Sequence, residues 1–87
     1  SLRGGTVEAL EAVAVGSSAT SRVIGRTIEQ IALPKGATIV GIVRGERALA
    51  GHHDTVIEGD DHIILFVEDK RSVRQVEMLF RAGALSP

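Results

Sequence analysis

The stretch that decides the fold runs from Gly25 to Phe66 and reads GRTIEQIALPKGATIVGIVRGERALAGHHDTVIEGDDHIILF. It opens with the capping-box pattern Thr27-Ile28-Glu29-Gln30, in which Thr27 and Gln30 can exchange side-chain-to-backbone hydrogen bonds. Pro34 ends this helix early, because the residue before a proline is disfavoured at helical angles. The pattern predicts a helix of roughly one and a half turns with three residues available to the core, Ile28, Ile31 and Leu33.

Two strands and a tight turn follow the short helix. Ala37 to Arg44 is rich in β-branched residues and predicts a strand, and Arg47 to Ala50 predicts its return. Gly45-Glu46 lies between them and fits a two-residue hairpin loop with glycine first, the preference of a type II′ turn. Gly41 interrupts the first strand and predicts a bulge or the close approach of another chain.

The second half of the stretch predicts a loop, a short strand, a turn and a longer strand. Residues 51–54 read as a polar loop, and Thr55-Val56-Ile57 as a short strand. Gly59-Asp60 predicts a turn in which glycine supplies the positive backbone angle. His62 to Val67 is an apolar run typical of a strand buried on both faces.

The flanking segments complete the fold prediction. Ser1 to Gly5 reads as a loose lead-in, and the alternating valines of residues 6–15 favour a strand. Asp69 is the expected N-cap of a final helix that ends at Gly83. Its apolar stripe consists of Val73, Val76, Leu79 and Phe80. We therefore expect one α+β domain over residues 1–87, with a small, mainly antiparallel sheet, one short helix and one longer helix in the order β-α-β-β-β-α.

The composition restricts the classes of function. A chain of 87 residues buries only roughly 60–65% of its unfolded surface, so contacts with a partner can add stability. The net charge is −1, and two Phe are the only aromatic residues. Nucleic-acid binding needs a concentrated positive field or aromatic stacking platforms, so we expect none. Without cysteine the chain can form neither a disulfide nor a thiolate metal site. No signal peptide and no apolar span of about 20 residues is visible.

The sequence contains no recognisable catalytic apparatus. The serines and threonines of residues 17–21 form no Gly-x-Ser-x-Gly elbow and read as loop and cap residues. The acidic residues fall on predicted turns and exposed helix positions, and the glycines match no phosphate-loop or dinucleotide fingerprint. We expect a chain that is not an enzyme.

Two groups of residues could bind a small effector. His52 and His53 precede Asp54, but adjacent histidines are expected to point apart and not to chelate together. We therefore expect no metal site there, although a site using one histidine and one aspartate from neighbouring loops stays open. Arg44 could face an anionic ligand, whereas a surface ion pair is the favoured interpretation. Arg44, His52 and His53 are the effector-binding candidates.

The order of motifs resembles a known family. The runs Val23–Gly45 and Ile57–Phe66 are similar to those in the C-terminal domain of RCK (regulator of potassium conductance) proteins, the RCK_C or TrkA-C family. The opening SLRGGTVEALEAVA and the closing EDKRSVRQVEMLF also resemble the members that regulate Trk-type bacterial potassium uptake. The resemblance therefore covers nearly the whole chain.

This resemblance implies a role and a set of partners. Members of the family are cytoplasmic proteins, peripheral to the membrane through the integral-membrane potassium transporter subunit that they regulate. An upstream Rossmann domain binds NAD or ATP, so that domain is expected outside this fragment, and no cofactor is expected within it. Such domains commonly form homodimers. Some members bind cyclic di-AMP through Arg and Asn after the short helix, but residues 32–38 here contain neither, so this ligand is not transferred.

The resemblance leads to a functional hypothesis with one alternative. We expect a regulatory domain that dimerises and couples the nucleotide state of a Rossmann domain to a potassium transporter. The alternative is an effector-binding or ion-binding domain that regulates another transporter, one for divalent ions or organic anions. The candidate dimer-interface residues are apolar ones left over from a small core, namely Ile39, Val40, Leu49 and Val56.

Overall fold

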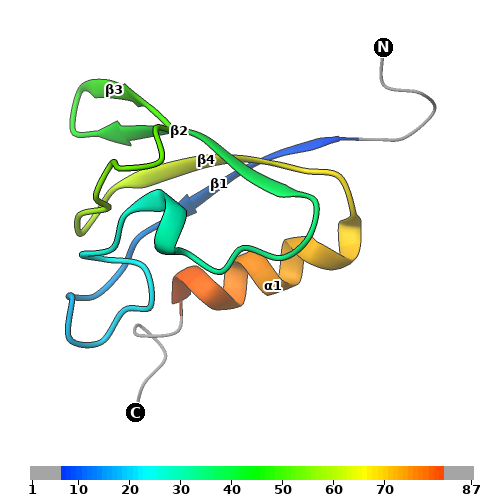
Figure 1. Cartoon of the computed structure of the whole chain (residues 1–87), viewed down its shortest axis with the longest axis horizontal. Coiled ribbons are helices and arrows are strands. Elements are labelled where there is room, and N and C mark those ends of the chain that lie inside the picture. The colour runs from blue at the N-terminus through cyan, green and yellow to red at the C-terminus, as the bar shows by residue number, and fades with distance from the viewer. Residues whose placement is uncertain (1–6, 82–87) are drawn as a thin grey trace.

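A computed structural model describes residues 7–81 as a four-stranded sheet with one α-helix against it (Figure 1). The strands are β1 (Glu8–Val13), β2 (Ala37–Arg44), β3 (Arg47–Ala50) and β4 (His62–Val67). The helices are a 3₁₀ turn, η1 (Ile28–Gln30), and α1 (Lys70–Arg81). All neighbouring strands are antiparallel, in the order β1-β4-β2-β3. The α+β prediction is confirmed, and β2, β3 and β4 have their predicted bounds.

The core lies between the sheet and α1. The helix places Val76 and Phe80 against the sheet, where both are almost fully buried. Asp69 caps it as predicted, since its side chain accepts the Arg71 N–H at 2.9 Å and its carbonyl accepts the Ser72 N–H at 2.8 Å. From the sheet the core receives Ala12, Ile39, Ile42, Ile63, Leu65 and Val67. The predicted lead-in Ser1–Gly5 and helix stop Gly83 lie outside the described residues.

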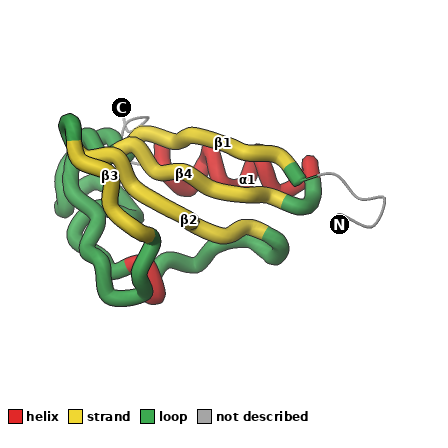
Figure 2. The backbone as a smooth tube through the Cα atoms, turned by 90° about the horizontal axis from the view of Figure 1, so that it is seen from above, coloured by secondary structure: helices red, strands yellow, loops and turns green. Residues whose placement is uncertain are grey.

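The prediction that β4 is buried on both faces is wrong. Ile63, Leu65 and Val67 point into the core, but Phe66 between them is 47% exposed. The reason is that α1 covers only one side of the sheet, and within residues 7–81 no element covers the other side (Figure 2). We call this uncovered surface the open face. The cross-strand register places on it the side chains of Ala9, Glu11, Val13, Thr38, Val43, Ala48, Ala50, His62, Ile64 and Phe66.

The predicted irregularity at Gly41 is confirmed as a β-bulge. The pairing between β2 and β4 shifts register between Ile39 and Gly41, which leaves Val40 as the extra residue. The Val40 carbonyl accepts the Gly51 N–H at 3.2 Å, so the end of β3 closes onto the bulge. The closest backbone approach is at Gly51, where an added Cβ would lie 2.6 Å from the Ile39 carbonyl oxygen.

Two short elements differ from the prediction. The first helix is only one 3₁₀ turn; the Thr27 N–H donates to Gln30 Oε1 at 2.9 Å, whereas the buried Thr27 hydroxyl has no partner among the described residues. Residues 55–57 do not form a strand, because Val56 makes a single bridge to Thr27. Both segments instead bond to each other, with the Ile28 N–H donating to the Thr55 carbonyl at 3.0 Å.

The two predicted turns are present, with one difference. Gly45 has φ 60 between the paired residues Arg44 and Arg47, as a turn with glycine first requires. In the second turn the positive angle falls on Asp60, with φ 70, and not on Gly59. Aspartate tolerates this conformation better than most residues with a side chain.

Candidate functional site

Arg44 ends β2 and lies over a buried carboxylate. Its Nε and one terminal nitrogen donate to the two carboxylate oxygens of Asp61 at 2.9 and 2.8 Å. The same terminal nitrogen also donates to the Val56 carbonyl at 2.8 Å, and the other one lies 3.0 Å from a carboxylate oxygen of Glu58. All three guanidinium nitrogens therefore have partners within the domain. This arrangement supports the ion-pair interpretation of Arg44 over effector binding.

The charge state of Asp61 follows from these contacts. The side chain is fully buried, and burial by itself would raise its pKa. The bidentate hydrogen bond from Arg44 and the Glu58 N–H, which donates at 2.8 Å, outweigh burial and place the pKa below its usual range. Asp61 is therefore an ionised, buried anchor that joins β2 to the turn before β4.

The loop after β3 brings two histidines together. Rings of His52 and His53 lie with their centroids 4.3 Å apart, and His52 Nδ1 contacts Asp54 Oδ1. One ligand atom from each of these three residues lies within 4.8 Å of the others. The expectation that the adjacent histidines point apart is thus wrong, because the loop is tightly turned. The contact with His52 also lowers the pKa of Asp54, which keeps that carboxylate ionised.

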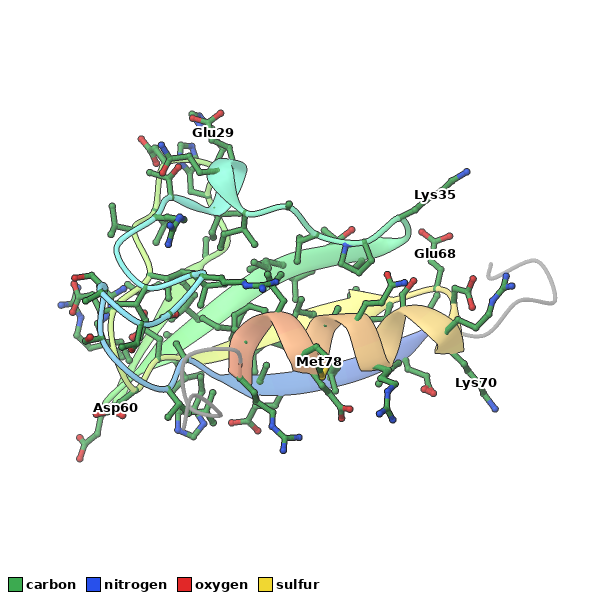
Figure 3. The ribbon with its side chains drawn as sticks, turned by 90° about the horizontal axis from the view of Figure 1, so that it is seen from below. Glu29, Lys35, Asp60, Glu68, Lys70 and Met78 are labelled. Carbon is green, nitrogen blue, oxygen red and sulfur yellow. The ribbon has the colours of Figure 1, made fainter. Side chains whose placement is uncertain are left out.

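A groove lined by three arginines lies between α1 and the segment after η1. It has a volume of about 510 Å³. Arg71 pairs with Asp69 at 3.1 Å, and Met78 projects from the same helix (Figure 3). The lining residues are Arg22, Ala32, Pro34, Arg71, Arg74, Gln75, Met78 and Leu79. Sequence reasoning missed this groove, because Arg22 reaches it from a distant segment.

The four candidate interface residues have different environments. Ile39 is a core residue, 5% exposed, so the premise that it is left over from the core is wrong. Leu49 packs partly against the core, while Val40 and Val56 are exposed. Sequence reasoning missed Phe66, Val43 and Val13. The β1 sequence Glu-Ala-Leu-Glu-Ala-Val gave no warning, because its polar and apolar residues do not alternate.

Comparison with known proteins gives one family and a consistent set of relatives. Residues 10–81 match the family model described as the TrkA-C domain. The chain is 53% identical over 83 residues to a Trk system potassium uptake protein TrkA from Halomonas elongata, covering 95% of the chain and 18% of the relative. It is 54% identical over 81 residues to the protein of the same name from Vibrio alginolyticus, covering 93% and 18%. The chain thus spans about one fifth of the length of these relatives.

A solved structure shares the fold. The RCK_C domain dimer of S. agalactiae BusR, in complex with c-di-AMP, superposes with a TM-score of 0.70 at 26% identity. The match covers 90% of this chain and 95% of that one.

Proposed function

Because the chain belongs to the TrkA-C domain family, we propose that it is a regulatory module of a Trk-type potassium uptake system. In this role the module dimerises and couples the nucleotide state of a neighbouring Rossmann domain to the membrane potassium transporter. Coupling of this kind requires an effector with different affinities for two arrangements of the assembly. The setting is the cytoplasmic side of the membrane, reached through the transporter. Within the described residues no helix is both long and apolar enough to cross a bilayer.

The open face is the observation that carries the dimer proposal. Large apolar side chains seldom gather uncovered on a monomer, and such patches often mark protein interfaces. Here Phe66, Val43 and Val13 are all exposed on one side of a four-stranded sheet. We propose a second copy as the occupant of this surface, and a related RCK_C domain that matches 90% of this chain and is a dimer supports that choice. The Glu11–His62 pair supplies a polar contact on the same surface.

Sedimentation of the Phe66→Glu variant tests the proposed interface. A charge inside an apolar interface is buried without a partner, which strongly disfavours association. We expect the unmodified chain to sediment as a dimer and the variant as a monomer. Met78→Glu is the matched control, because Met78 is 55% exposed but lies on α1, away from the open face. A monomeric unmodified chain, or equal loss of the dimer in both variants, would contradict the proposal.

The arginine groove supports a second candidate function, the binding of an anionic effector. Guanidinium groups bind phosphates through directed, charge-assisted hydrogen bonds. The Arg22 and Arg74 side chains line the groove from opposite segments, and a related dimer binds c-di-AMP. Such a module could also regulate a transporter for divalent ions or organic anions.

Calorimetric titration with c-di-AMP, ATP and NAD tests this second function. We expect saturable binding of one of these ligands that is lost in the double variant Arg22→Ala/Arg74→Ala. Arg47→Ala is the control, since Arg47 lies on β3 outside the groove. Absence of binding for all three ligands, or equal binding by the double variant, leaves dimerisation as the supported role.

A further inference from the structure

The loop that joins β3 to β4 carries a cluster of side chains with the chemistry of metal ligands. We propose that His52, His53 and Asp54 form a binding site for a divalent transition-metal ion of the zinc type. The site is separate from the arginine groove and does not depend on the proposed regulatory role. Its residues are neither core residues nor members of the Arg44–Asp61 ion pair.

The spacing of the ligand atoms suits a single ion. One atom from each of the three side chains lies within 4.8 Å of the other two. Ligand atoms around tetrahedral zinc lie about 3.3 Å apart, given zinc–ligand distances of about 2.0–2.1 Å. Because His52, His53 and Asp54 are all more than half exposed, small side-chain rotations bring them to that spacing at little packing cost. The bound ion would take the place of the direct contact between His52 Nδ1 and Asp54 Oδ1.

The backbone holds the loop in the required shape before any ion binds. The Glu29 N–H of η1 donates to the His53 carbonyl at 3.0 Å, and the Ile28 N–H donates to the Thr55 carbonyl at 3.0 Å. On the other side, the Thr55 N–H donates to the His52 carbonyl at 3.1 Å. These bonds tie the histidine loop to η1, so the ligands come from a fixed segment and not from a loosely tethered one.

Glu29 completes the site from the neighbouring element. Its carboxylate lies 3.7 Å from His53 Nδ1, and it projects from the outer side of η1 (Figure 3). Ligating histidines in zinc sites commonly bond a carboxylate through their second ring nitrogen, which fixes the ring orientation. The 3.7 Å separation is longer than a hydrogen bond, so Glu29 is assigned as the positioning residue for His53 through a small rotation of these two exposed side chains that closes the gap.

The donor set selects the class of ion. Two imidazoles and a carboxylate suit zinc and its first-row neighbours, whereas calcium and magnesium favour oxygen ligands alone. Three protein ligands leave one coordination position to water.

The chain contains its own internal comparison. It has three histidines, and the third, His62, contacts a carboxylate of Glu11 on the open face. Like the His52–Asp54 contact, the His62–Glu11 pair joins an imidazole to a carboxylate, and its side chains are similarly exposed. It differs because no second histidine belongs to it. His62→Ala is therefore the matched control for the loss of one imidazole.

Titration of the untagged chain with zinc chloride, followed by calorimetry, tests the proposal. Cobalt(II), with its visible absorption bands, reports the coordination number as a second readout. We expect one ion per chain and at least a tenfold weaker affinity in His52→Ala and in His53→Ala, with His62→Ala unchanged. A Glu29→Gln variant keeps the cobalt spectrum while binding more weakly, as expected of a positioning residue.

Two outcomes overturn the proposal. The first is zinc binding by the unmodified chain no tighter than by the double variant His52→Ala/His53→Ala. The second is equal weakening by His62→Ala. Circular dichroism of each variant confirms that it is folded; since all the substituted side chains are more than a third exposed, their removal leaves the core intact.

Discussion

At the scale of single residues, Asp61 combines complete burial with a charge. Isolated buried carboxylates are costly, and this one is tolerated because Arg44 and the Glu58 N–H satisfy its oxygens. Glu58 also contacts Arg44, but its side chain is 60% exposed. We therefore expect Asp61 to contribute more than Glu58 to the stability of the fold.

Removal of the buried partner tests this difference. We expect Asp61→Ala to lower the free energy of unfolding by about 2–4 kcal/mol, because Arg44 loses its bidentate hydrogen bond and the Glu58 N–H loses its acceptor. Glu58→Gln should cost less than about 1 kcal/mol, as exposed ion pairs do. Urea unfolding of the two variants measures both values, and similar losses would disprove the assigned roles.

The same aspartate predicts a dependence of stability on pH. Burial opposes ionisation of Asp61, but its contacts with Arg44 and Glu58 hold the folded-state pKa below that of the unfolded chain. The contribution of Asp61 to the free energy of unfolding is therefore fully present above the unfolded-state pKa. This contribution is lost as the pH falls through the folded-state pKa. We expect the urea midpoint to decrease in the acid range, and the decrease to be shallower in Asp61→Asn. Parallel pH profiles for both proteins would contradict this assignment.

At the scale of elements, the β-bulge and the end of β3 form one closed unit. Val40 is the extra residue of β2, and its carbonyl bonds the Gly51 N–H. Gly51 must lack a side chain there, since a Cβ would lie 2.6 Å from the backbone oxygen of Ile39. A Cβ added at Gly41 would lie 3.3 Å from the backbone oxygen of Leu49.

Substitution by alanine at the two glycines distinguishes a required close approach from a tolerated one. We expect Gly51→Ala to destabilise the domain by about 1–3 kcal/mol, the typical cost of forced backbone shifts. Gly41→Ala should cost less, because its neighbour needs to move by only a few tenths of an ångström. Thermal unfolding of both variants checks this order. A larger loss for Gly41→Ala than for Gly51→Ala would contradict the close approach assigned to Gly51.

Elements whose limits depend on local sequence could be predicted. Features that depend on whether another element covers a face of the sheet could not. β2, β3 and β4 are bounded by glycines, charged residues and a hairpin turn, so their limits are visible in the sequence. The exposure of Phe66 is not visible, because an apolar run does not reveal whether one face or two will be covered. Residues 55–57 have strand-like composition, but within residues 7–81 they form a single bridge, from Val56 to Thr27 in an irregular segment.

The candidate sites show the same division. Arg44 could be predicted to form an ion pair, but its partner lies 17 residues away and was not identifiable by spacing. The His52–His53 arrangement depends on backbone bonds between the loop and η1, which no local pattern encodes. The arginine groove joins Arg22 to α1 across the fold, and only the tertiary structure brings these residues together.

At the scale of the whole molecule, size and the open face act together. A domain of 87 residues leaves much of its apolar surface in water, and α1 covers one side of the sheet only. Association through the open face would therefore stabilise the folded state by mass action.

This linkage predicts that stability depends on protein concentration. We expect the unfolding midpoint of the unmodified chain to rise by a few degrees between low and high micromolar concentration, and that of Phe66→Glu to stay constant. Calorimetric scans at two concentrations measure this. A midpoint independent of concentration in the unmodified chain would show that the folded domain does not need its partner surface.

The two edges of the sheet determine how far assembly can go. β1 carries Glu8 on the same side as the core-facing Ala12, and β3 is only four residues long and begins with Arg47. An inward-pointing charge and a short edge strand both obstruct the addition of further strands, which would otherwise build fibres. Face-to-face contact about a twofold axis closes on itself. These edge features oppose strand-by-strand polymerisation, so a dimer formed through the open face, as proposed, would not extend further.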